Sequence, residues 1–150
     1  MEVLRGQVYY VMPTEPTIGS EMRPGRPAIV VSADWINATS SVVEVVYLTT
    51  QDKKEMGTHV RIEATGREST ALCEQISTVA IERLGSYCGC LDRYEMDAVD
   101  KALSESLCLD GEDVEKSPET LLRNAVRQAR TMGAEAGPYL MGTLDYYLGK

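Results

Sequence analysis

The sequence predicts a mainly β domain with helices, in which a small antiparallel β-barrel is closed on one side by an α-helix over about residues 92–107. Two observations support this fold class. Up to residue 91, short apolar runs are bounded by glycine and proline, which is typical of strands joined by turns. Near Asp92, the apolar spacing changes to that of a helix. Short strands followed by one packing helix favour a barrel that the helix covers.

Six segments are rich in β-branched or aromatic residues and are expected to be strands. They are residues 7–12, 27–32, 42–50, 58–63, 70–76 and 84–91. Residues 13–26 hold three prolines and two glycines and are expected to form a long loop, and a loop of that length is often functional. Residues 34–41 are turn-like, with room for one helical turn, and residues 51–57 form a polar connection.

The helix that closes the barrel carries an apolar stripe formed by Met96, Val99, Leu103 and Leu107. Asp92 is a suitable N-cap, with Glu95 three residues later as in a capping box. This pattern predicts that the helix begins directly after Asp92 and packs through its stripe on the strands.

We divide the chain into a barrel domain, residues 1–109, and a helical C-terminal extension, residues 110–150, which is not an independent domain. Residues 110–117 read as an acidic linker. Ser117-Pro118-Glu119 predicts a helix start, with serine as the cap and proline in the first turn. Gly137-Pro138 is expected to end this helical unit. The simplest expectation is that the extension packs against the barrel or against a second subunit.

Composition excludes several classes of protein. A net charge of −8 argues against broad adhesion to nucleic acid, although a small basic cleft can exist on an acidic body. The four cysteines lack a paired CxxC pattern, so reduced and mostly buried thiols are expected rather than a zinc site, and no cofactor is expected. No apolar stretch has the length of a membrane helix and no signal-peptide core is present, so we expect a cytoplasmic protein without membrane contact.

Three segments carry groups suited to phosphodiester chemistry. The long loop presents Glu21, Arg23 and Arg26 just before an apolar strand. Thr49-Thr50-Gln51 follows another strand, and Thr58-His59 opens the next. A guanidinium can hold a phosphate through two donors, a threonine hydroxyl can donate to a developing oxyanion, and a carboxylate or the single histidine can act as a base. We expect these strand ends to converge on one edge of the barrel.

The order of these motifs resembles the MazF/PemK toxin family over about residues 5–109. The matching motifs are Arg5-Gly6-Gln7-Val8-Tyr9-Tyr10, Gly19-Ser20-Glu21, Arg26-Pro27-Ala28-Ile29-Val30-Val31-Ser32, Leu48-Thr49-Thr50-Gln51, Thr58-His59-Val60, Glu74-Gln75-Ile76 and Ile81-Glu82-Arg83-Leu84. The resemblance implies an SH3-like barrel, usually a homodimer, that cleaves single-stranded RNA without a metal ion. It also implies a cognate antitoxin protein as partner, with DNA bound only through that antitoxin.

By motif match, the resemblance assigns catalysis to Arg26 and Thr49. Glu21 is our candidate for the base, and His59 is either the alternative base or an RNA contact. Gln75 either reads a base edge or pairs across the sheet. The remaining candidate RNA contacts are Arg23, Thr50 and Gln51. The resemblance does not explain Arg23.

Two other functions stay open at this point. A non-cleaving binding module can use the same fold, as gyrase-poisoning relatives do, and a degenerate toxin can serve as a regulatory or DNA-binding partner. In the extension, an arginine stripe formed by Arg123, Arg127 and Arg130 could contact RNA or an acidic antitoxin. Residues 139–148 could instead occupy the antitoxin groove and inhibit the enzyme.

Overall fold

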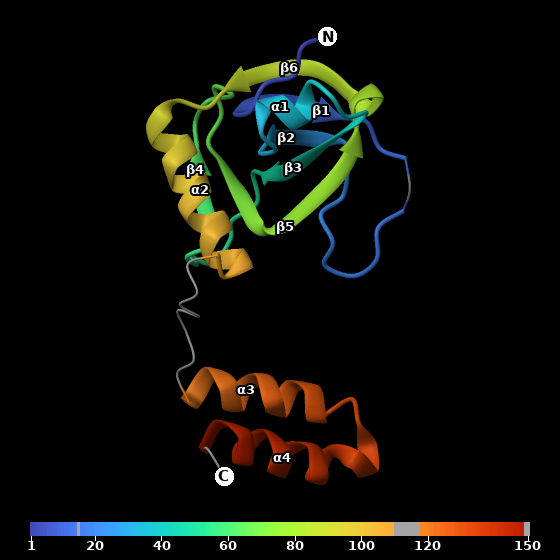
Figure 1. Cartoon of the computed structure of the whole chain (residues 1–150), viewed down its shortest axis with the longest axis vertical. Helices are drawn as coiled ribbons and strands as arrows, with labels where there is room; N and C mark the ends of the chain where they lie inside the picture. Colours follow the sequence, from blue (N-terminus) through green and yellow to red (C-terminus); the bar gives the residue numbers. More distant parts are fainter. Residues whose placement is uncertain (15, 110–117, 149–150) are drawn as a thin grey trace. The chain divides into compact units, whose positions relative to one another are not determined.

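The computed structural model describes residues 1–14, 16–109 and 118–148, and it divides the chain into two compact units, Met1–Asp110 and Gly111–Lys150 (Figure 1). The first unit holds all six strands, and their bounds are β1 (Gln7–Val11), β2 (Arg26–Val30), β3 (Val42–Thr49), β4 (His59–Ile62), β5 (Ser69–Ala80) and β6 (Leu84–Cys90). Its helices are α1 (Asp34–Asn37), the short 3-10 turn η1 (Ile81–Arg83) and α2 (Arg93–Leu107). Each predicted strand is confirmed within a few residues, except that β5 continues to Ala80.

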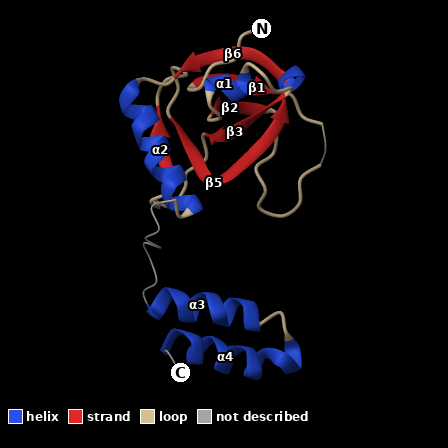
Figure 2. Cartoon of the chain, viewed as in Figure 1, coloured by secondary structure: helices blue, strands red, loops and turns tan. Residues whose placement is uncertain are grey.

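The strands form one antiparallel sheet in the order β4-β5-β3-β2-β1-β6 (Figure 2). Strand pairing does not close this sheet into the predicted barrel, since β4 and β6 are its two edges. The edges do come close, because a side chain on Gly89 of β6 would collide with the carbonyl of Ala64, just after β4. The mainly β class is therefore confirmed, while barrel closure is replaced by a close approach of two edges.

Strand β5 is longer than predicted because its polar second half still pairs with β3. Val79 lies opposite Val43 and is buried, although Ser77 and Thr78 before it look like the end of a strand. The register shifts between Val46 and Leu48, and Figure 2 shows β5 turning sharply partway along. This bend curves the sheet, and β5 contributes buried side chains to both core clusters, Ala71 and Cys73 to one and Val79 to the other.

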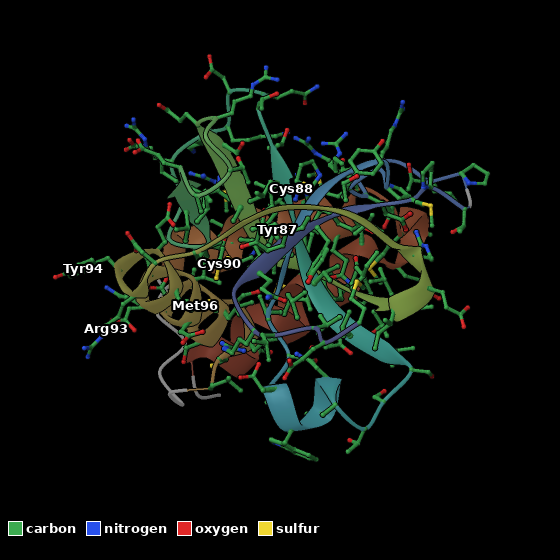
Figure 3. The ribbon with its side chains drawn as sticks, turned by 90° about the horizontal axis from the view of Figure 1, so that it is seen from above. Tyr87, Cys88, Cys90, Arg93, Tyr94 and Met96 are labelled. Atoms are coloured by element: carbon green, nitrogen blue, oxygen red, sulfur yellow. The ribbon has the colours of Figure 1, made fainter. Side chains whose placement is uncertain are left out.

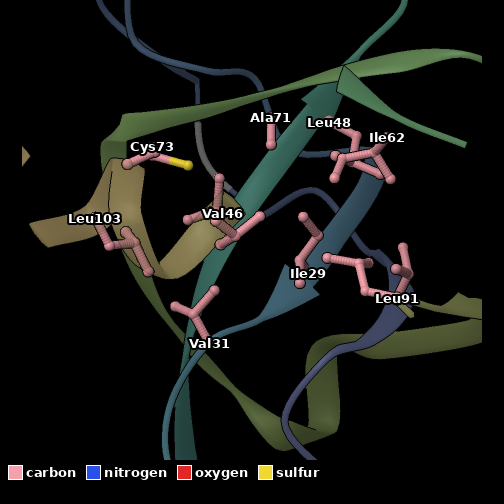
Figure 4. Packing of buried hydrophobic residues seen from close by; sticks show 12 residues of the cluster. Ile29, Val31, Val46, Leu48, Ile62, Ala71, Cys73, Leu91 and Leu103 are labelled. Carbon is pink, nitrogen blue, oxygen red and sulfur yellow. The ribbon is translucent and has the colours of Figure 1, made fainter. Parts of the chain in front are cut away.

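Buried side chains form two clusters because neighbouring residues on a strand point to opposite faces. One cluster packs against α2, and Figure 4 shows Leu103 of α2 beside Val46 and Cys73. The other cluster contains Ala28, Val45 and Tyr47. Since Arg26 and Thr49 lie two residues from Ala28 and Tyr47 on their strands, their side chains belong to this second face.

Helix α2 begins as predicted, with a complete capping box in which Asp92 accepts from the backbone of Glu95 at 2.8 Å. Val99 and Leu103 are buried, and Met96 is partly buried against the first cluster. The prediction is wrong for Leu107, which is 53% exposed. The helix ends at Leu107, and its C-cap Cys108, with a positive φ of 54°, turns the chain away before a further turn can pack.

The second unit contains α3 (Pro118–Ala129), the 3-10 turn η2 (Gly133–Glu135) and α4 (Ala136–Leu148). The predicted helix start at Pro118 is confirmed, whereas Ser117 and the acidic linker over residues 110–117 lie outside the described residues. The prediction that Gly137-Pro138 ends the unit is wrong, since both residues lie in the first turn of α4. Proline is tolerated there because the first helical N–H groups have no intrahelical partner. No helix among the described residues is long and apolar enough to span a membrane.

Candidate functional site

Arg26 is the first residue of β2 and lies opposite Val11 of β1. Its Nε is buried and has no hydrogen-bond partner among the described residues. Its Nη1 makes one weak contact, a donation to the sulfur of Met22 at 3.8 Å. A buried guanidinium nitrogen without a partner is costly, so the side chain is suited to an anionic oxygen supplied from outside.

Thr49 ends β3, is 4% exposed and lies opposite Thr70 of β5. Its Oγ1 accepts a hydrogen bond from the backbone N–H of Gln51 at 3.2 Å and keeps its own hydrogen for another acceptor. The pairing of β2 with β3 ends at Ala28 and Tyr47. Arg26 and Thr49 each lie two residues beyond this last pair, and the alternation of side chains puts both on the same face of the sheet.

The loop between β1 and β2 is fastened over this face by Gln75 of β5. The side-chain oxygen of Gln75 accepts from the backbone of Met22 at 2.7 Å, and its nitrogen donates to the carbonyl of Ser20 at 3.2 Å. Met22 packs against the second core cluster, where it also contacts Arg26. In this arrangement the amide of Gln75 holds the loop, and it makes no hydrogen bond to a neighbouring strand among the residues that the structure describes.

Glu21 and Arg23 lie in the same loop and are exposed. Glu21 accepts from the backbone N–H of Ile18 at 3.1 Å, so one carboxylate oxygen orders its own loop. Arg23 has no hydrogen bond or ion pair with any residue that the structure describes. The structure thus places Glu21 and Arg23 at the surface, and Arg26 beneath the loop.

Two open grooves lie along this part of the sheet. The first has a volume of about 700 Å³ and is lined by Thr49, Thr50, Gln51, His59, Lys53 and Lys54 among others. The second has a volume of about 530 Å³ and is lined by Glu21, Met22, Tyr47, Gln75 and Arg83 among others. Strand β3 contributes to both grooves, through Thr49 and Tyr47 respectively. Arg26 lines neither of these two grooves, and Met22, which lines the second, contacts its guanidinium.

His59 opens β4, and both of its ring nitrogens have partners. Nδ1 lies 2.7 Å from the carbonyl oxygen of Lys54, and Nε2 lies 2.9 Å from Oε1 of Glu74. Burial alone would raise the pKa of Glu74, but hydrogen bonds from its own backbone and from His59 outweigh burial and lower that pKa. His59 is therefore bound to an ionised carboxylate at one edge and to the β3–β4 loop at the other.

Several residues near the site were not predicted from the sequence. Lys53 and Lys54 sit in a segment whose polar composition indicates only a connection. Tyr47 is almost fully buried, and burial raises its pKa while the nearby Arg83 and Arg26 oppose that effect. Arg83 donates twice to the carbonyl of Met12, at 3.2 and 3.0 Å, and so anchors the start of the β1–β2 loop. The lysine pair is visible in the sequence, but its groove appears only in the fold.

The four thiols are free, as predicted, but most are not buried. Only Cys73 is buried. Cys88 and Cys90 lie two residues apart on the edge strand β6, and Cys108 is the C-cap of α2. Figure 3 shows Cys88 and Cys90 on β6, with Arg93 and Tyr94 pointing outward from the first turn of α2. Within the described part of the chain, no three cysteine, histidine or acidic side chains gather in a way that could hold a metal ion.

Comparison with known proteins places these features in a family. The family model of PemK-like, MazF-like toxins of type II toxin–antitoxin systems matches residues 4–107, which lie within the first unit. Endoribonuclease EndoA of Bacillus subtilis is 40% identical over 114 residues, covering 73% of this chain and 97% of that protein. Endoribonuclease MazF of Staphylococcus epidermidis is 35% identical over 120 residues, covering 77% and 99%.

Solved structures agree with the sequence comparison. A mycobacterial endoribonuclease in complex with its cognate antitoxin has a TM-score of 0.60 and 27% identity, over 71% of this chain and 96% of that one. The region that the family model matches contains Arg26, Thr49 and both grooves. This chain therefore belongs to the family of PemK-like, MazF-like toxins of type II toxin–antitoxin systems.

Proposed function

We propose that this toxin is an endoribonuclease that cleaves single-stranded RNA without a metal ion, at the strand ends that carry Arg26 and Thr49. The observation that carries this proposal is the buried Nε of Arg26, which has no hydrogen-bond partner among the described residues and lies on the same face of the sheet as Thr49. The curated relatives named as endoribonucleases support the same reaction class. A phosphate oxygen would satisfy the guanidinium and the hydroxyl together.

RNA supplies its own nucleophile, the 2′-OH beside the scissile phosphate. The 2′-oxygen attacks phosphorus while the bond from phosphorus to the 5′-oxygen breaks. A base takes the 2′-OH proton, and the departing 5′-oxygen receives a proton. The products are a 2′,3′-cyclic phosphate and a 5′-OH end. The protein must therefore stabilise charge on the non-bridging oxygens and manage two protons.

Arg26 stabilises the phosphate charge through its guanidinium, and Thr49 donates a hydrogen bond to a non-bridging oxygen. Glu21 acts as the base: its second carboxylate oxygen is not held by the Ile18 backbone, and the side chain lines a groove beside Gln75. Because Met22 contacts Arg26 in the present conformation, the β1–β2 loop shifts when RNA binds. Gln75 and Arg83, which fasten that loop, set how readily it shifts.

The partners follow from the family. The toxin binds single-stranded RNA and a cognate antitoxin, acts as a homodimer in the cytoplasm, and reaches DNA only through the antitoxin. Thr50, Gln51, His59, Gln75 and Arg23 form or support the RNA-binding surface around the two catalytic residues. The complex of a mycobacterial relative with its antitoxin supports the protein partner.

A cleavage assay in EDTA tests the proposal. Purified toxin is incubated with a mixed-sequence RNA and, in parallel, with the same sequence carrying 2′-deoxyriboses. We expect cleavage of the ribose substrate only, with 2′,3′-cyclic phosphate and 5′-OH ends, and loss of cleavage in Arg26→Ala. Equal cleavage of both substrates, or a strict requirement for Mg²⁺, would contradict the mechanism. Intact RNA over a range of sequences would instead indicate a non-cleaving binding module.

A further inference from the structure

We propose that Glu74 and His59 are positioning residues that hold the β3–β4 loop, residues 50–58, along the groove beside Thr49. This inference rests on the proposed RNA cleavage for its effect on activity, while its structural part can be measured without RNA. Glu74 lies on β5, His59 opens β4, and Lys54 belongs to the loop. The three groups form a chain of hydrogen bonds from the sheet to the loop, which we call the histidine clasp.

The first step in the argument is which atoms carry hydrogen. A backbone carbonyl only accepts, so the contact of 2.7 Å with Lys54 requires a proton on Nδ1 of His59. Glu74 has a lowered pKa and accepts through Oε1, so the contact of 2.9 Å requires a proton on Nε2 as well. With both contacts made, neither ring nitrogen has a free lone pair. His59 in this state connects two elements and cannot accept the 2′-OH proton.

The second step is the surroundings of the clasp, which leave the ring few other partners. The hydroxyl of Thr58, beside His59, is buried and faces Glu74 without reaching good hydrogen-bond geometry. On β4, Arg61 is paired with Glu63 at 3.0 Å and with Glu68 at 2.6 Å. From α2, the carboxylate of Glu105 lies against Gly57 at the end of the loop. Glu74 is thus the carboxylate that engages the ring.

The third step is what the clasp holds. Between residues 52 and 57, no other described side chain from outside the loop hydrogen-bonds to the loop backbone. The tie at Lys54 therefore fixes the middle of the loop and, with it, the two exposed lysines that line the groove with Thr49. Lysine is a strong phosphate ligand when its backbone is fixed, because less conformational freedom is lost on binding.

The consequence separates binding from chemistry. When the loop is loosened, part of the free energy of RNA binding is lost in ordering it. The half-saturating RNA concentration therefore rises. Arg26 and Thr49 stand on strands and keep their positions, so the cleavage rate at saturation changes little. We expect Glu74→Ala to weaken RNA binding about tenfold, a modest preorganisation effect. Glu74→Gln keeps the clasp, because a side-chain amide can accept from Nε2 or donate to it.

The test combines RNA-analogue affinity with NMR of the protonation of the His59 ring. Affinity for a 2′-deoxy analogue is measured for the wild type, Glu74→Ala and Glu74→Gln. Glu68→Gln is the control, since it removes one carboxylate charge from the lining of the groove and Glu68 pairs with Arg61 rather than with His59. Nitrogen NMR of the ring is unambiguous because the chain has one histidine. We expect protons on both Nδ1 and Nε2 in the wild type, a proton kept on Nδ1 in Glu74→Gln, and a mixture of tautomers in Glu74→Ala.

Unchanged affinity in Glu74→Ala, or the same weakening in Glu68→Gln, would overturn the proposal. So would a wild-type ring without a proton on Nδ1, a result that needs no variant and no RNA. If the toxin cleaves no RNA, the proposed function fails, whereas the ring spectra and the analogue affinities still decide the clasp. A rate at saturation that falls as much in Glu74→Ala as in Arg26→Ala would also contradict a positioning role.

Discussion

Arg26 lies on the same sheet face as Thr49, and His59 lines a groove with Thr49, yet the polar atoms of the two side chains differ in an informative way. Arg26 has a buried Nε without a partner and one weak contact with sulfur. His59 has both ring nitrogens bound within 2.9 Å. A buried donor without a partner is suited to a substrate, whereas a ring whose nitrogens are both bonded is suited to holding the protein in shape. This difference supports the proposed division, in which Arg26 acts in chemistry and His59 in positioning.

The largest expected effect is on Arg26. Arg26→Ala removes the cation from the phosphate, and we expect the cleavage rate at saturating RNA to fall about 10³-fold, as for loss of a preorganised donor to a developing charge. Arg23→Ala is the matched control, since it removes an exposed arginine from the loop just before β2, and we expect its rate at saturation to stay within about threefold. Circular dichroism checks that both variants fold. Equal losses in the two variants would show that loop charge matters rather than the position of Arg26.

Thr49 gives the next largest effect. Thr49→Val keeps the shape and the β-branched character of a 4% exposed side chain and removes the donor. We expect a loss of about 10²-fold in the single-turnover rate, the lower part of the range for one such donor. Thr70→Val, on the strand opposite, serves as control because Thr70 faces Thr49 in the register. A normal rate in Thr49→Val would remove this hydroxyl from the mechanism.

The clasp also predicts how stability depends on pH. The pKa of Glu74 is lowered in the folded state, so its ionised form favours folding. This contribution is complete above the pKa of an unfolded glutamate, about 4.3, and is lost as the pH falls through the lower folded value. Urea unfolding of the wild type and Glu74→Gln across this range should show a gap in midpoint that closes in acid. A gap that widens in acid would mean that the carboxylate is unfavourable in the fold.

The smallest expected effect is on thiol labelling, which tests whether removing Glu74 affects only the loop or also the core around Cys73. Burial, with a smaller contribution from the charge of Glu74, raises the pKa of Cys73 to about 12, so its thiol stays protonated and enclosed. Native toxin should react with a maleimide at the exposed Cys90 and Cys108 and not at Cys73. If Glu74 acts on the loop alone, Glu74→Ala keeps Cys73 protected. Rapid labelling of Cys73 in that variant would mean that removing Glu74 opens the core.

The sequence predicts the strands well because β-branched runs and glycine or proline boundaries act locally. It also predicts the start of α2, since a capping box involves residues only three apart. The extent of β5 and the exposure of Leu107 were not predictable in this way, because tertiary pairing decides the first and a left-handed residue at Cys108 decides the second. Similarly, a Gly-Pro pair marks the beginning of α4 as readily as the end of α3.

For the site, the order of motifs points to Arg26 and Thr49, but it does not indicate how their neighbours are used. Gln75 holds Met22, which is 53 residues away in the sequence, and Glu74 holds His59, which is 15 residues away. Such contacts depend on the bend in β5 that brings its middle beside both loops. Residues expected to touch RNA, such as Gln75 and His59, therefore have structural partners that composition and spacing do not reveal.

Single-turnover cleavage across a range of RNA concentrations, with Arg26→Ala and Glu74→Ala compared side by side in EDTA, tests the central claim most directly. It separates the rate at saturation from the half-saturating concentration for each side chain. We predict that Arg26→Ala lowers the rate at saturation, whereas Glu74→Ala raises the half-saturating concentration and leaves that rate nearly unchanged. A Glu74→Ala variant that loses its rate at saturation, or an Arg26→Ala variant that keeps it, would contradict the assignment of chemistry to the unpartnered arginine and of positioning to the saturated histidine.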